Sequence, residues 1–476
     1  MKINNKKELF ITLIIVFLSF LIRVIRLDIP HDWSFDEVYH ALSAEAYALN
    51  DLRGYEYWNA SPKDLAWEWL HPPIGKLLMA ASIKIFAKPY IPVAKSDPVD
   101  GVTSFAWRFP GTIFAALTVY LLIIFGKKMF SSFWVGAATG ALYALDGLSF
   151  VQSRTGMNDI FVTFFVVWAF YRLYILIADY AGPAARQPQN QPTRGTPLLG
   201  HPASHHPLMN LLLLGIASGL AASTKWTGFY MVAIAFIWGE IFLLTKRDFK
   251  KFFFGLFYLG LLPFIVYLLS YGQWWLQGHT IKQFYELHQQ IWWYQTGLKA
   301  THGYQSAALT WPILYRPVWF YVKYQDVVKN GMKQLYIGNI YTMGNPLIWW
   351  AGLAGILYLV HQLADWFLHW WKDIKLKTSL LPLGIVLIGY FGMFLPWTLS
   401  PRIMFLYHYL PSIPFLCLGL AYTLSQIRKT GPIGRKGVTI YLILVVLAFI
   451  YFYPQWSALP LPQKWVDQYY WLPSWK

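Results

Sequence analysis

Long apolar runs alternate with short polar segments along most of the chain. A helix that crosses a bilayer needs about 20 mostly apolar residues, and hydrophobic periodicity is the main guide to such elements. The runs predict eleven membrane-spanning helices, at about residues 9–27, 109–126, 133–150, 158–178, 209–223, 227–245, 252–271, 347–368, 380–398, 404–424 and 437–455. The pattern therefore predicts an all-α polytopic membrane protein.

The composition agrees with this class. Of the 476 residues, 57% are hydrophobic and only 13% are charged, whereas a water-soluble domain has about 25% charged residues. The net charge of +17 raises the question of nucleic acid. We find no basic stripe of the kind that contacts nucleic acid, and most basic residues stand between spans, so nucleic acid is not an expected partner.

The basic residues predict the orientation of the chain, because cytoplasmic loops are enriched in Lys and Arg. The short loops that this rule places outside carry only Arg154, Lys225 and Arg402. The N-terminus is therefore predicted to be cytoplasmic and the C-terminus outside, in a multi-pass protein of the plasma membrane. The N-terminal segment and every second loop after it, which are predicted to be cytoplasmic, hold the following basic residues: Lys2, Lys6, Lys7, Lys127, Lys128, Arg186, Arg194, Lys246, Arg247, Lys250, Lys251, Lys372, Lys375, Lys377, Arg428, Lys429, Arg435 and Lys436.

Residues 74–90 are apolar but are interrupted by Lys76, Lys84 and Lys88. Counting them as a span would reverse every later loop and place the basic clusters outside. We therefore expect a helix that lies on the outer membrane interface.

Two long exported loops, 28–108 and 272–346, divide the chain. We expect an N-terminal transmembrane catalytic module (1–271) that includes the first loop, then the second loop, then a C-terminal module (347–476) of four transmembrane helices and an exported tail. The first apolar run is too long for a typical signal core, so it is expected to remain as an uncleaved span. The single cysteine, Cys417, excludes an internal disulfide.

Asp36 and Glu37 follow the first span, where the chain has just left the bilayer. Charges at such a position are costly unless they are solvated or used. A carboxylate here could remove the proton of a hydroxyl that attacks a sugar carbon. The alternative is a solvated pair, or a cap for a helix that begins near Val38.

His71-Pro72-Pro73 is a rigid turn, since each proline fixes its own φ and restricts the preceding residue. Gly75 and Lys76 then open the interfacial helix. The turn either starts that helix and does nothing more, or it presents His71 and Lys76 to an anionic group at the headgroup level.

Cations gather at the outer end of the predicted spans. Arg108 begins the second span, and an arginine there either snorkels to the interface or grips a phosphate with its planar guanidinium. The outer ends also hold Arg154, Lys225, Arg402 and His408. Their convergence predicts an anion held at the outer surface.

Asp146 and Asp159 flank the same short outer loop as Arg154. They have either an internal ion-pairing role or a direct role in the site. The cytoplasmic residues His201, His205 and His206 are expected to be a solvated loop and not a metal site. No metal ligand set is predicted, no cofactor is identified, and a divalent cation remains possible.

These motifs together resemble the protein O-mannosyltransferase family, over about residues 10–455. No single motif would be specific, but their order and spacing are. The matching segments are Phe35-Asp36-Glu37, His71 to Lys76, Asp146 to Asp159, Gly219 to Gly228 and Tyr407 to Pro411.

The resemblance implies a GT-C type helical bundle and an enzyme that transfers mannose, with inversion, from a polyprenyl-phosphate mannose donor to Ser or Thr hydroxyls of exported polypeptides. It implies that Asp36 is the base and that Arg108 is an important arginine. Eukaryotic members carry a β-trefoil insert for which loop 272–346 has no room, so the chain resembles the shorter bacterial form.

Two alternatives remain open. One is a GT-C enzyme that uses another polyprenyl-phosphate sugar or a glycolipid acceptor. The other is a transporter, which should place ionisable residues near the membrane midplane. Here most charges stand at span ends, which favours an enzyme at the interface.

Overall fold

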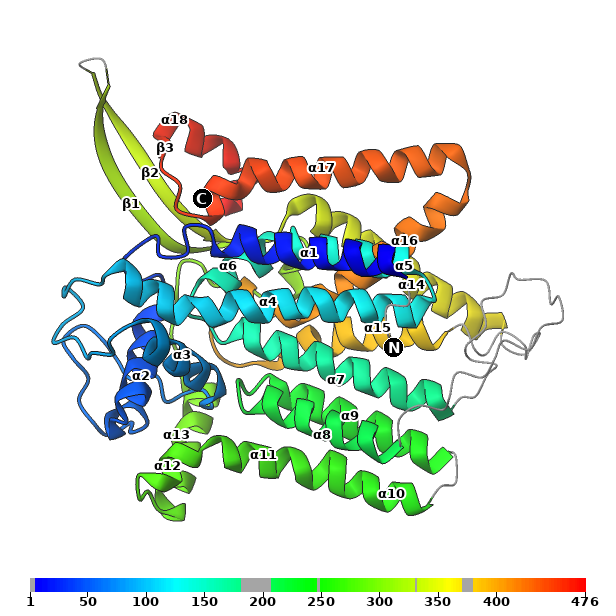
Figure 1. Ribbon diagram of the computed structural model, residues 1–476, viewed down its shortest axis with the longest axis horizontal. Helices are drawn as coiled ribbons and strands as arrows, with labels where there is room; N and C mark the ends of the chain where they lie inside the picture. Colours follow the sequence, from blue (N-terminus) through cyan, green and yellow to red (C-terminus); the bar gives the residue numbers. More distant parts are fainter. Residues whose placement is uncertain (1–4, 181–206, 246–248, 330–331, 370–379) are drawn as a thin grey trace.

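The computed structural model of the chain describes residues 5–180, 207–245, 249–329, 332–369 and 380–476. It is a bundle of long helices that run side by side, with loops and short elements gathered at one end (Figure 1). The bundle helices are α1 (Lys6–Val24), α4 (Gly101–Phe130), α5 (Phe133–Ala144), α7 (Asp159–Tyr180), α8 (Pro207–Ala222), α9 (Gly228–Thr245), α10 (Phe249–Gly255), α11 (Leu262–Ser270), α14 (Pro346–His369), α15 (Leu381–Phe394), α16 (Ile413–Lys429) and α17 (Pro432–Trp456).

Each of the eleven predicted spans overlaps one of these helices. Among the described residues, seven helices are long and apolar enough to cross a membrane, and two shorter apolar helices accompany them. A π-helical segment, Leu256–Leu261, joins α10 to α11 into one continuous rod. The chain is therefore a mostly helical, multi-pass membrane protein.

The ends of two predicted spans were wrong. The span at 133–150 is interrupted, because α5 ends at Ala144 and a separate short helix, α6 (Gly147–Arg154), follows. The second span begins earlier than residue 109, since Asp100 caps α4 by accepting a hydrogen bond from the Thr103 amide at 2.6 Å. Capping by a side chain satisfies a backbone donor that the first helical turn leaves free.

The prediction of an all-α protein was also wrong, because the second long loop contains a β-hairpin. Strands β1 (Val318–Lys329) and β2 (Met332–Thr342) pair along their whole length, and β2 also pairs with the short strand β3 (Leu461–Pro462). Aromatic and β-branched residues, which favour strands, are frequent in β1. The dipeptide Asn330-Gly331 between the strands is a strong hairpin signal that the sequence analysis missed.

The remaining elements lie at the same end of the bundle as the hairpin (Figure 1). Helix α3 occupies the interfacial segment, packs against α2 and α4, and is not among the candidate spans. These elements are α2 (Glu37–Leu49), α3 (Ile74–Phe86), α12 (Gly272–Leu276), α13 (Ile281–Gly297), α18 (Gln463–Val466) and the 3₁₀ turns Leu52–Gly54, Ala308–Thr310, Leu395–Leu399, Leu406–Ser412, Asp467–Tyr469 and Pro473–Trp475.

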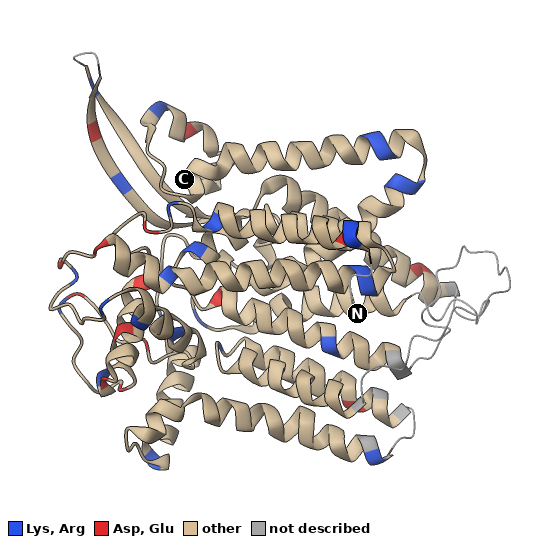
Figure 2. Cartoon of the chain, in the orientation of Figure 1, with Lys and Arg blue, Asp and Glu red and all other residues tan. Residues whose placement is uncertain are grey.

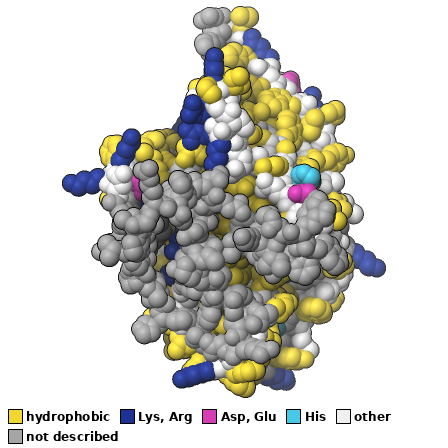
Figure 3. Space-filling model, turned by 90° about the vertical axis from the view of Figure 1, so that its right-hand side faces the viewer, with side chains coloured by type: hydrophobic (Ala, Val, Ile, Leu, Met, Phe, Trp, Pro, Cys, Tyr) yellow, Lys and Arg dark blue, Asp and Glu magenta, His cyan; other side chains and the backbone are white. Residues whose placement is uncertain are grey.

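Helix α1 begins at one end of the bundle and α17 finishes at the other (Figure 1). Lys and Arg residues lie near the end where α1 begins, for example Lys127 and Lys128 in the last turn of α4 and Arg428 and Lys429 in the last turn of α16 (Figure 2). Figure 3 looks onto this end and shows dark blue basic side chains around its rim. Asp and Glu residues, in contrast, are more frequent at the end that carries the long loops (Figure 2).

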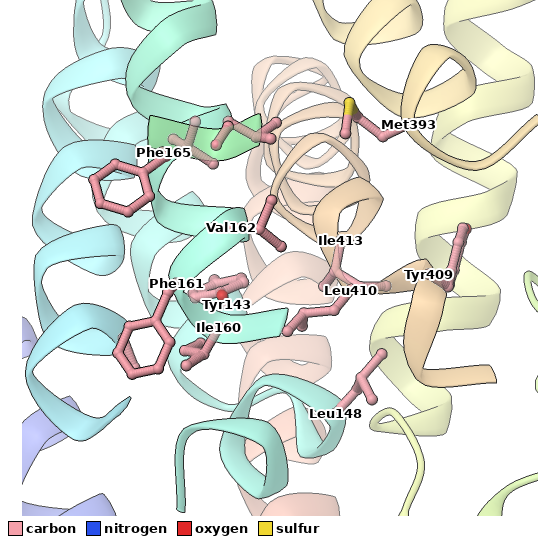
Figure 4. Packing of buried hydrophobic residues seen from close by; sticks show 14 of the residues in the cluster. Tyr143, Leu148, Ile160, Phe161, Val162, Phe165, Met393, Tyr409, Leu410 and Ile413 are labelled. Carbon is pink, nitrogen blue, oxygen red and sulfur yellow. The ribbon is translucent and has the colours of Figure 1, made fainter. Parts of the chain in front are cut away.

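The core consists of aliphatic and aromatic side chains between the helices (Figure 4). Ile160 and Val162 of α7 are fully buried and lie near Leu410 and Ile413, just before and at the start of α16, whereas the Phe161 ring meets Phe114 of α4 at 5.0 Å. Close approach of α4 and α5 requires a small residue, since a Cβ at Gly136 would lie 2.2 Å from the Ile123 carbonyl oxygen. Small residues permit such packing between membrane helices.

Candidate active site

Asp36 stands directly before α2, but its carboxylate does not cap the helix. Its backbone carbonyl accepts hydrogen bonds from the amides of Tyr39 and His40 at 3.0 Å, while its side chain makes no capping bond. The side chain is half-buried and no hydrogen bond to it is formed by the described residues. Helix capping is therefore excluded as its role, and the carboxylate is available for chemistry.

The residue before Asp36 holds an uncommon backbone conformation. Phe35 has a φ of 51°, a left-handed value that is unusual for a bulky residue and persists only where surrounding contacts impose it. Its ring stacks on Phe320 of β1 at 4.3 Å and meets the edges of Phe405 and Tyr407 at 6.1 and 5.8 Å. Rings from distant segments thus fix the turn that aims Asp36.

Glu37 has the opposite environment to its neighbour. Its side chain is fully buried and accepts every hydrogen bond that its two oxygens can readily hold. The donors are the Ser34 amide (2.8 Å), the Trp107 indole (3.0 Å), the Arg108 Nε and Nη2 atoms (2.7 Å each) and the Gly156 amide (2.8 Å). Glu37 therefore locks the Asp36 turn onto α4 and the loop before α7.

Arg108 uses all five of its N–H donors within the protein. Two go to Glu37, two go from Nη1 to the carbonyls of Leu27 (3.2 Å) and Pro30 (2.6 Å), and one goes from Nη2 to the Asp32 carbonyl (2.9 Å). Its side chain is 1% exposed, so it does not snorkel. Because a guanidinium has five donors, no donor remains for a phosphate in this arrangement.

Arg154 is likewise used within the protein. Its guanidinium donates to the carbonyls of Arg23 (2.5 Å), Ile25 (2.7 Å) and Arg26 (2.9 Å). These carbonyls lie at the end of α1, where the last helical turn leaves acceptors free. The structure places Arg154 as a cap that joins α6 to α1, away from an open site.

Asp146 caps α6 and joins it to the C-terminal half of the chain. Its Oδ2 accepts from the Ser149 amide at 2.9 Å, and its Oδ1 accepts from the Asn345 amide at 3.1 Å and the Trp349 indole at 2.7 Å. The side chain is fully buried. Asp146 therefore has an internal role, but through hydrogen bonds to neutral donors and not through the ion pair that the sequence had left open.

Lys225 and Asp159 form a buried ion pair on the site side of α7. The Lys225 Nζ lies 2.8 and 2.9 Å from the two Asp159 oxygens, and both side chains are nearly inaccessible. The same Nζ lies 5.4 Å from the centre of the Tyr407 ring, within the range of a cation–π contact. This pair brings a cation and an anion into the surroundings of Asp36.

Arg402 is a cation that keeps free donors at the site. Its Nη2 lies 3.5 Å from the His408 Nε2, its guanidinium carbon lies 5.8 Å from the centre of the Tyr294 ring, and its buried Nε has no hydrogen-bond partner. His408 is nearly inaccessible, with Nδ1 2.9 Å from the Phe405 carbonyl oxygen. No carboxylate in the described part of the chain pairs with Arg402.

The two candidate residues of the His71 turn, His71 and Lys76, have different environments. Lys76 is fully buried, and its Nζ contacts Glu68 Oε2 at 2.5 Å, the Glu68 carbonyl, and the His71 carbonyl at 3.0 Å. The His71 ring stacks with His40 at 5.9 Å, and its buried Nδ1 has no partner. The turn therefore leaves His71 with spare hydrogen-bonding capacity, while Lys76 supports the loop from inside.

Sequence reasoning missed Glu68, His40, Asn158 and Tyr294. His40 Nδ1 lies 3.6 Å from Glu68 Oε2 and 3.3 Å from Asn158 Nδ2. Glu68 stands three residues before His71, and His40 lies one helical turn after Asp36, so their spacing could have indicated them. No sequence spacing relates Tyr294 to Asp36.

The charges around Asp36 affect its protonation. Burial raises the pKa of the Asp36 carboxyl, His40 and Lys225 lower it, Glu68 and Asp159 raise it, and the net pKa lies above the ordinary aspartate value. A catalytic base acts best when its pKa approaches the working pH. The environment thus moves Asp36 in the direction that a general base requires.

Within the described residues, no group of three or more His, Cys, Asp or Glu side chains lies in an arrangement that could hold a metal ion. The three histidines at 201, 205 and 206 lie outside the described residues.

The fold defines a class of protein. It is a mostly helical membrane bundle with its long loops at one end, and this fold is similar to that of solved membrane proteins. It aligns with ArnT from Cupriavidus metallidurans bound to undecaprenyl phosphate at a TM-score of 0.52 and 13% identity, over 91% of this chain and 63% of that chain. It also aligns with the oligosaccharyltransferase of Archaeoglobus fulgidus at a TM-score of 0.51 and 14% identity, over 97% and 57%.

The chain belongs to the protein O-mannosyltransferase family. Residues 13–272 match the family described as dolichyl-phosphate-mannose-protein mannosyltransferase, and residues 280–475 match the C-terminal four TMM region of protein-O-mannosyltransferase. The family predicted from the motifs is confirmed, the chain is a glycosyltransferase, and a transporter is excluded.

Bacterial relatives carry a description that matches this family, and a solved yeast structure has a similar fold. The polyprenol-phosphate-mannose–protein mannosyltransferase of Mycobacterium tuberculosis is 28% identical, over 86% of this chain and 81% of its own length. The enzyme of the same description from Corynebacterium glutamicum is 23% identical, over 87% and 86%. The Saccharomyces cerevisiae Pmt1–Pmt2 complex bound to the sugar donor aligns at a TM-score of 0.80 and 17% identity, over 100% of this chain and 93% of that chain.

Proposed function

We propose that this protein transfers mannose from polyprenyl-phosphate mannose to Ser and Thr hydroxyls of exported polypeptides, with inversion, at the outer membrane–water boundary. The observation that carries the proposal is the contrast between two adjacent carboxylates. Glu37 is saturated with hydrogen bonds, whereas Asp36 accepts none from the described residues and lies among charged side chains of both signs. One carboxylate is thus built into the fold and the other is left for the reaction.

Asp36 acts as the general base. The acceptor oxygen forms a bond to the anomeric carbon as the bond from that carbon to the phosphate oxygen breaks. The hydroxyl proton passes to the Asp36 carboxylate, and the polyprenyl phosphate leaves with the electron pair. Phosphate is a good leaving group, so this scheme needs no general acid on the donor side.

Arg402, with His408 and Lys225, holds the donor phosphate. Arg402 has unused donors and no carboxylate partner among the described residues, and a guanidinium matches the geometry of phosphate oxygens. His71 adds a buried ring nitrogen without a partner. Arg108, which the motif had indicated for this task, instead positions Asp36 through Glu37.

The orientation follows from the charges. The end of the bundle with the site carries both long loops, and the opposite end carries the basic last turns of α4 and α16 (Figure 2). We place the basic end in the cytoplasm and the site outside. In this division residues 1–271 form the catalytic module, and the C-terminal module (347–476) adds Arg402 and His408.

The test is transfer from labelled polyprenyl-phosphate mannose to a Ser/Thr-rich peptide by the purified full-length protein. Asp36→Asn keeps the size of the side chain but cannot accept the proton. It should retain donor binding and thermal stability while turnover falls by about 10²–10⁴-fold.

Asp64→Asn is a matched control. Asp64 is an exposed carboxylate with a φ of 62°, a conformation that Asn tolerates, so this variant should retain wild-type turnover. Wild-type turnover in folded Asp36→Asn would remove Asp36 from the mechanism.

A further inference from the structure

An open cleft lies between the loop that carries Asp36 and the hairpin. It has a volume of about 420 Å³, with Trp33, Phe35 and Val38 on one side and residues 319–322 of β1 on the other. The hairpin projects from the site end of the bundle (Figure 1). The proposed transfer reaction leaves the cleft without a role, and the hairpin enters it only through the contact of Phe320 with Phe35.

The cleft follows the edge of β1, not one of its faces. Successive side chains of a strand point to opposite faces, so a wall made of four consecutive residues, 319–322, must run along the strand edge. The strand order is β1-β2-β3, and β1 pairs only with β2. The other edge of β1 therefore presents backbone donors and acceptors that no described strand satisfies, which is the arrangement that pairs with an added strand.

A bulge connects this edge to the catalytic turn. The pairing register shifts between Trp319 and Tyr321, which leaves Phe320 as the extra residue. Bulges bend a strand and redirect side chains, and they are frequent next to active sites. Phe320 stacks on Phe35 at 4.3 Å, and Phe35 is the residue before Asp36. The strand edge thus contacts the residue that directly precedes the proposed base.

We propose that the acceptor polypeptide binds in extended conformation along the free edge of β1, adding a strand to the sheet, with its hydroxyl side chain directed past Phe35 to Asp36. The inference rests on the proposed function, because it requires a polypeptide acceptor that Asp36 deprotonates. In this mode, hydrogen bonds between main chains supply affinity and pockets for alternate side chains supply selectivity. Such a site accepts varied sequences around the modified residue.

Acceptor peptides that carry a single backbone N-methyl group test the proposal. Only alternate residues of an added strand point their amides toward its partner. We expect methylation of every second residue on one side of the acceptor Ser or Thr to raise the KM for peptide by about five- to ten-fold, the value of one hydrogen bond. The residues between should show little change, and the KM for donor should stay constant.

A substitution in the hairpin gives an independent measurement. Phe320 is buried, so Phe320→Ala should lower the melting temperature. In the fraction that folds, loss of the ring that joins the strand edge to Phe35 should raise the KM for peptide while the KM for donor stays constant, and Phe320→Tyr should restore both stability and KM. Val328→Ala is the control, since Val328 is 70% exposed in the distal part of β1 and lies outside the cleft.

The outcomes separate the two proposals. If unmodified peptide is mannosylated but the N-methyl series has no alternation, the acceptor does not bind as a strand, and the proposed function stands. If unmodified peptide receives no mannose at all, the proposed function fails and this inference fails with it.

Discussion

Asp36 and Glu37 are neighbours in the sequence with different physical tasks. Glu37 compensates a buried arginine, and Asp36 remains free at the edge of the site. A buried charge without its partner is strongly destabilising, whereas a half-buried carboxylate without hydrogen bonds can be neutralised at little structural cost. Stability and activity should therefore depend on different members of the pair.

Glu37→Gln tests this division. It leaves the Arg108 charge buried without a counterion, so we expect a loss of about 3–5 kcal/mol in the free energy of unfolding, seen as a lower melting temperature in detergent. Asp36→Asn, in the same assay, should melt like the wild-type protein. Equal melting temperatures for the two variants would contradict the assignment.

Arg402→Ala tests the assignment of the phosphate. Hydrogen bonds to charged groups contribute about 1.5–3 kcal/mol, so the KM for donor should rise by about 10- to 100-fold while the KM for peptide changes little. Lys84→Ala, which removes an exposed cation of α3 at the same end of the bundle, is the control. An unchanged KM for donor would indicate that residues other than Arg402 bind the phosphate.

The pH profile depends on the surroundings of Asp36. Only its deprotonated form accepts the proton, so kcat/KM should fall as the pH drops through the raised Asp36 pKa. His40 lowers that pKa, so His40→Gln should raise it further and shift the acid limb to higher pH. A limb that moves to lower pH in this variant would oppose Asp36 as the titrating group.

At the scale of elements, the short helix α6 connects the two halves of the chain. Arg154 at its end binds the final carbonyls around α1, and Asp146 at its start binds the segment that leads into α14. The motif from Asp146 to Asp159 thus contains a structural clamp followed by the ion pair of Asp159 with Lys225. Its first acidic residue holds helices together, and its last one forms a buried ion pair with Lys225.

Asp146→Ala should therefore act on stability. It leaves the Ser149 and Asn345 amides and the Trp349 indole without an acceptor, and each unsatisfied buried donor costs about 1–3 kcal/mol. We expect a clear drop in melting temperature and an unchanged KM for both substrates in the fraction that folds. Asp146→Asn keeps one acceptor oxygen and should lose less.

At the scale of the whole molecule, the bundle has two chemically distinct ends. One end has the basic helix termini, and the other has both long loops, the hairpin and the site (Figures 1 and 2). This separation is what an enzyme with a lipid-linked donor and an exported acceptor requires, since both substrates must meet at a single membrane face.

Cysteine labelling tests which end faces out. Val93 and Ile433 are 81% and 89% exposed and lie at opposite ends of the chain's predicted topology, and the native Cys417 is buried. An impermeant thiol reagent applied to intact cells should label Val93→Cys and spare Ile433→Cys, while both should react after permeabilisation. The reverse pattern would invert the topology.

Much of the fold was predictable from local features. All eleven predicted spans overlap helices, and the interfacial segment is helical, because length and apolarity act within a single segment. The exceptions also have local causes. Asp146 ends a predicted span by capping α6, and the β-hairpin was missed although Asn330-Gly331 stood between two strand-like runs.

The site was less predictable, because the sequence gives the position of a charged residue along the chain but not the groups to which it will bind. Arg108 and Arg154 stand at span ends as expected, yet both donate their hydrogen bonds to acceptors within the protein. Arg402 stands in a similar position and remains free. Nothing in the three local sequences separates these outcomes.

The sequence by itself determined the membrane class, the family and the residue types at the site, since hydrophobicity, loop charge and motif spacing are properties of the chain. Only the tertiary structure decided which carboxylate is compensated and which is free. That choice depends on contacts between segments far apart in sequence, such as Glu37 with Arg108 and Phe35 with Phe320. The environment of a charge, and hence its chemistry, exists only once those segments have packed together.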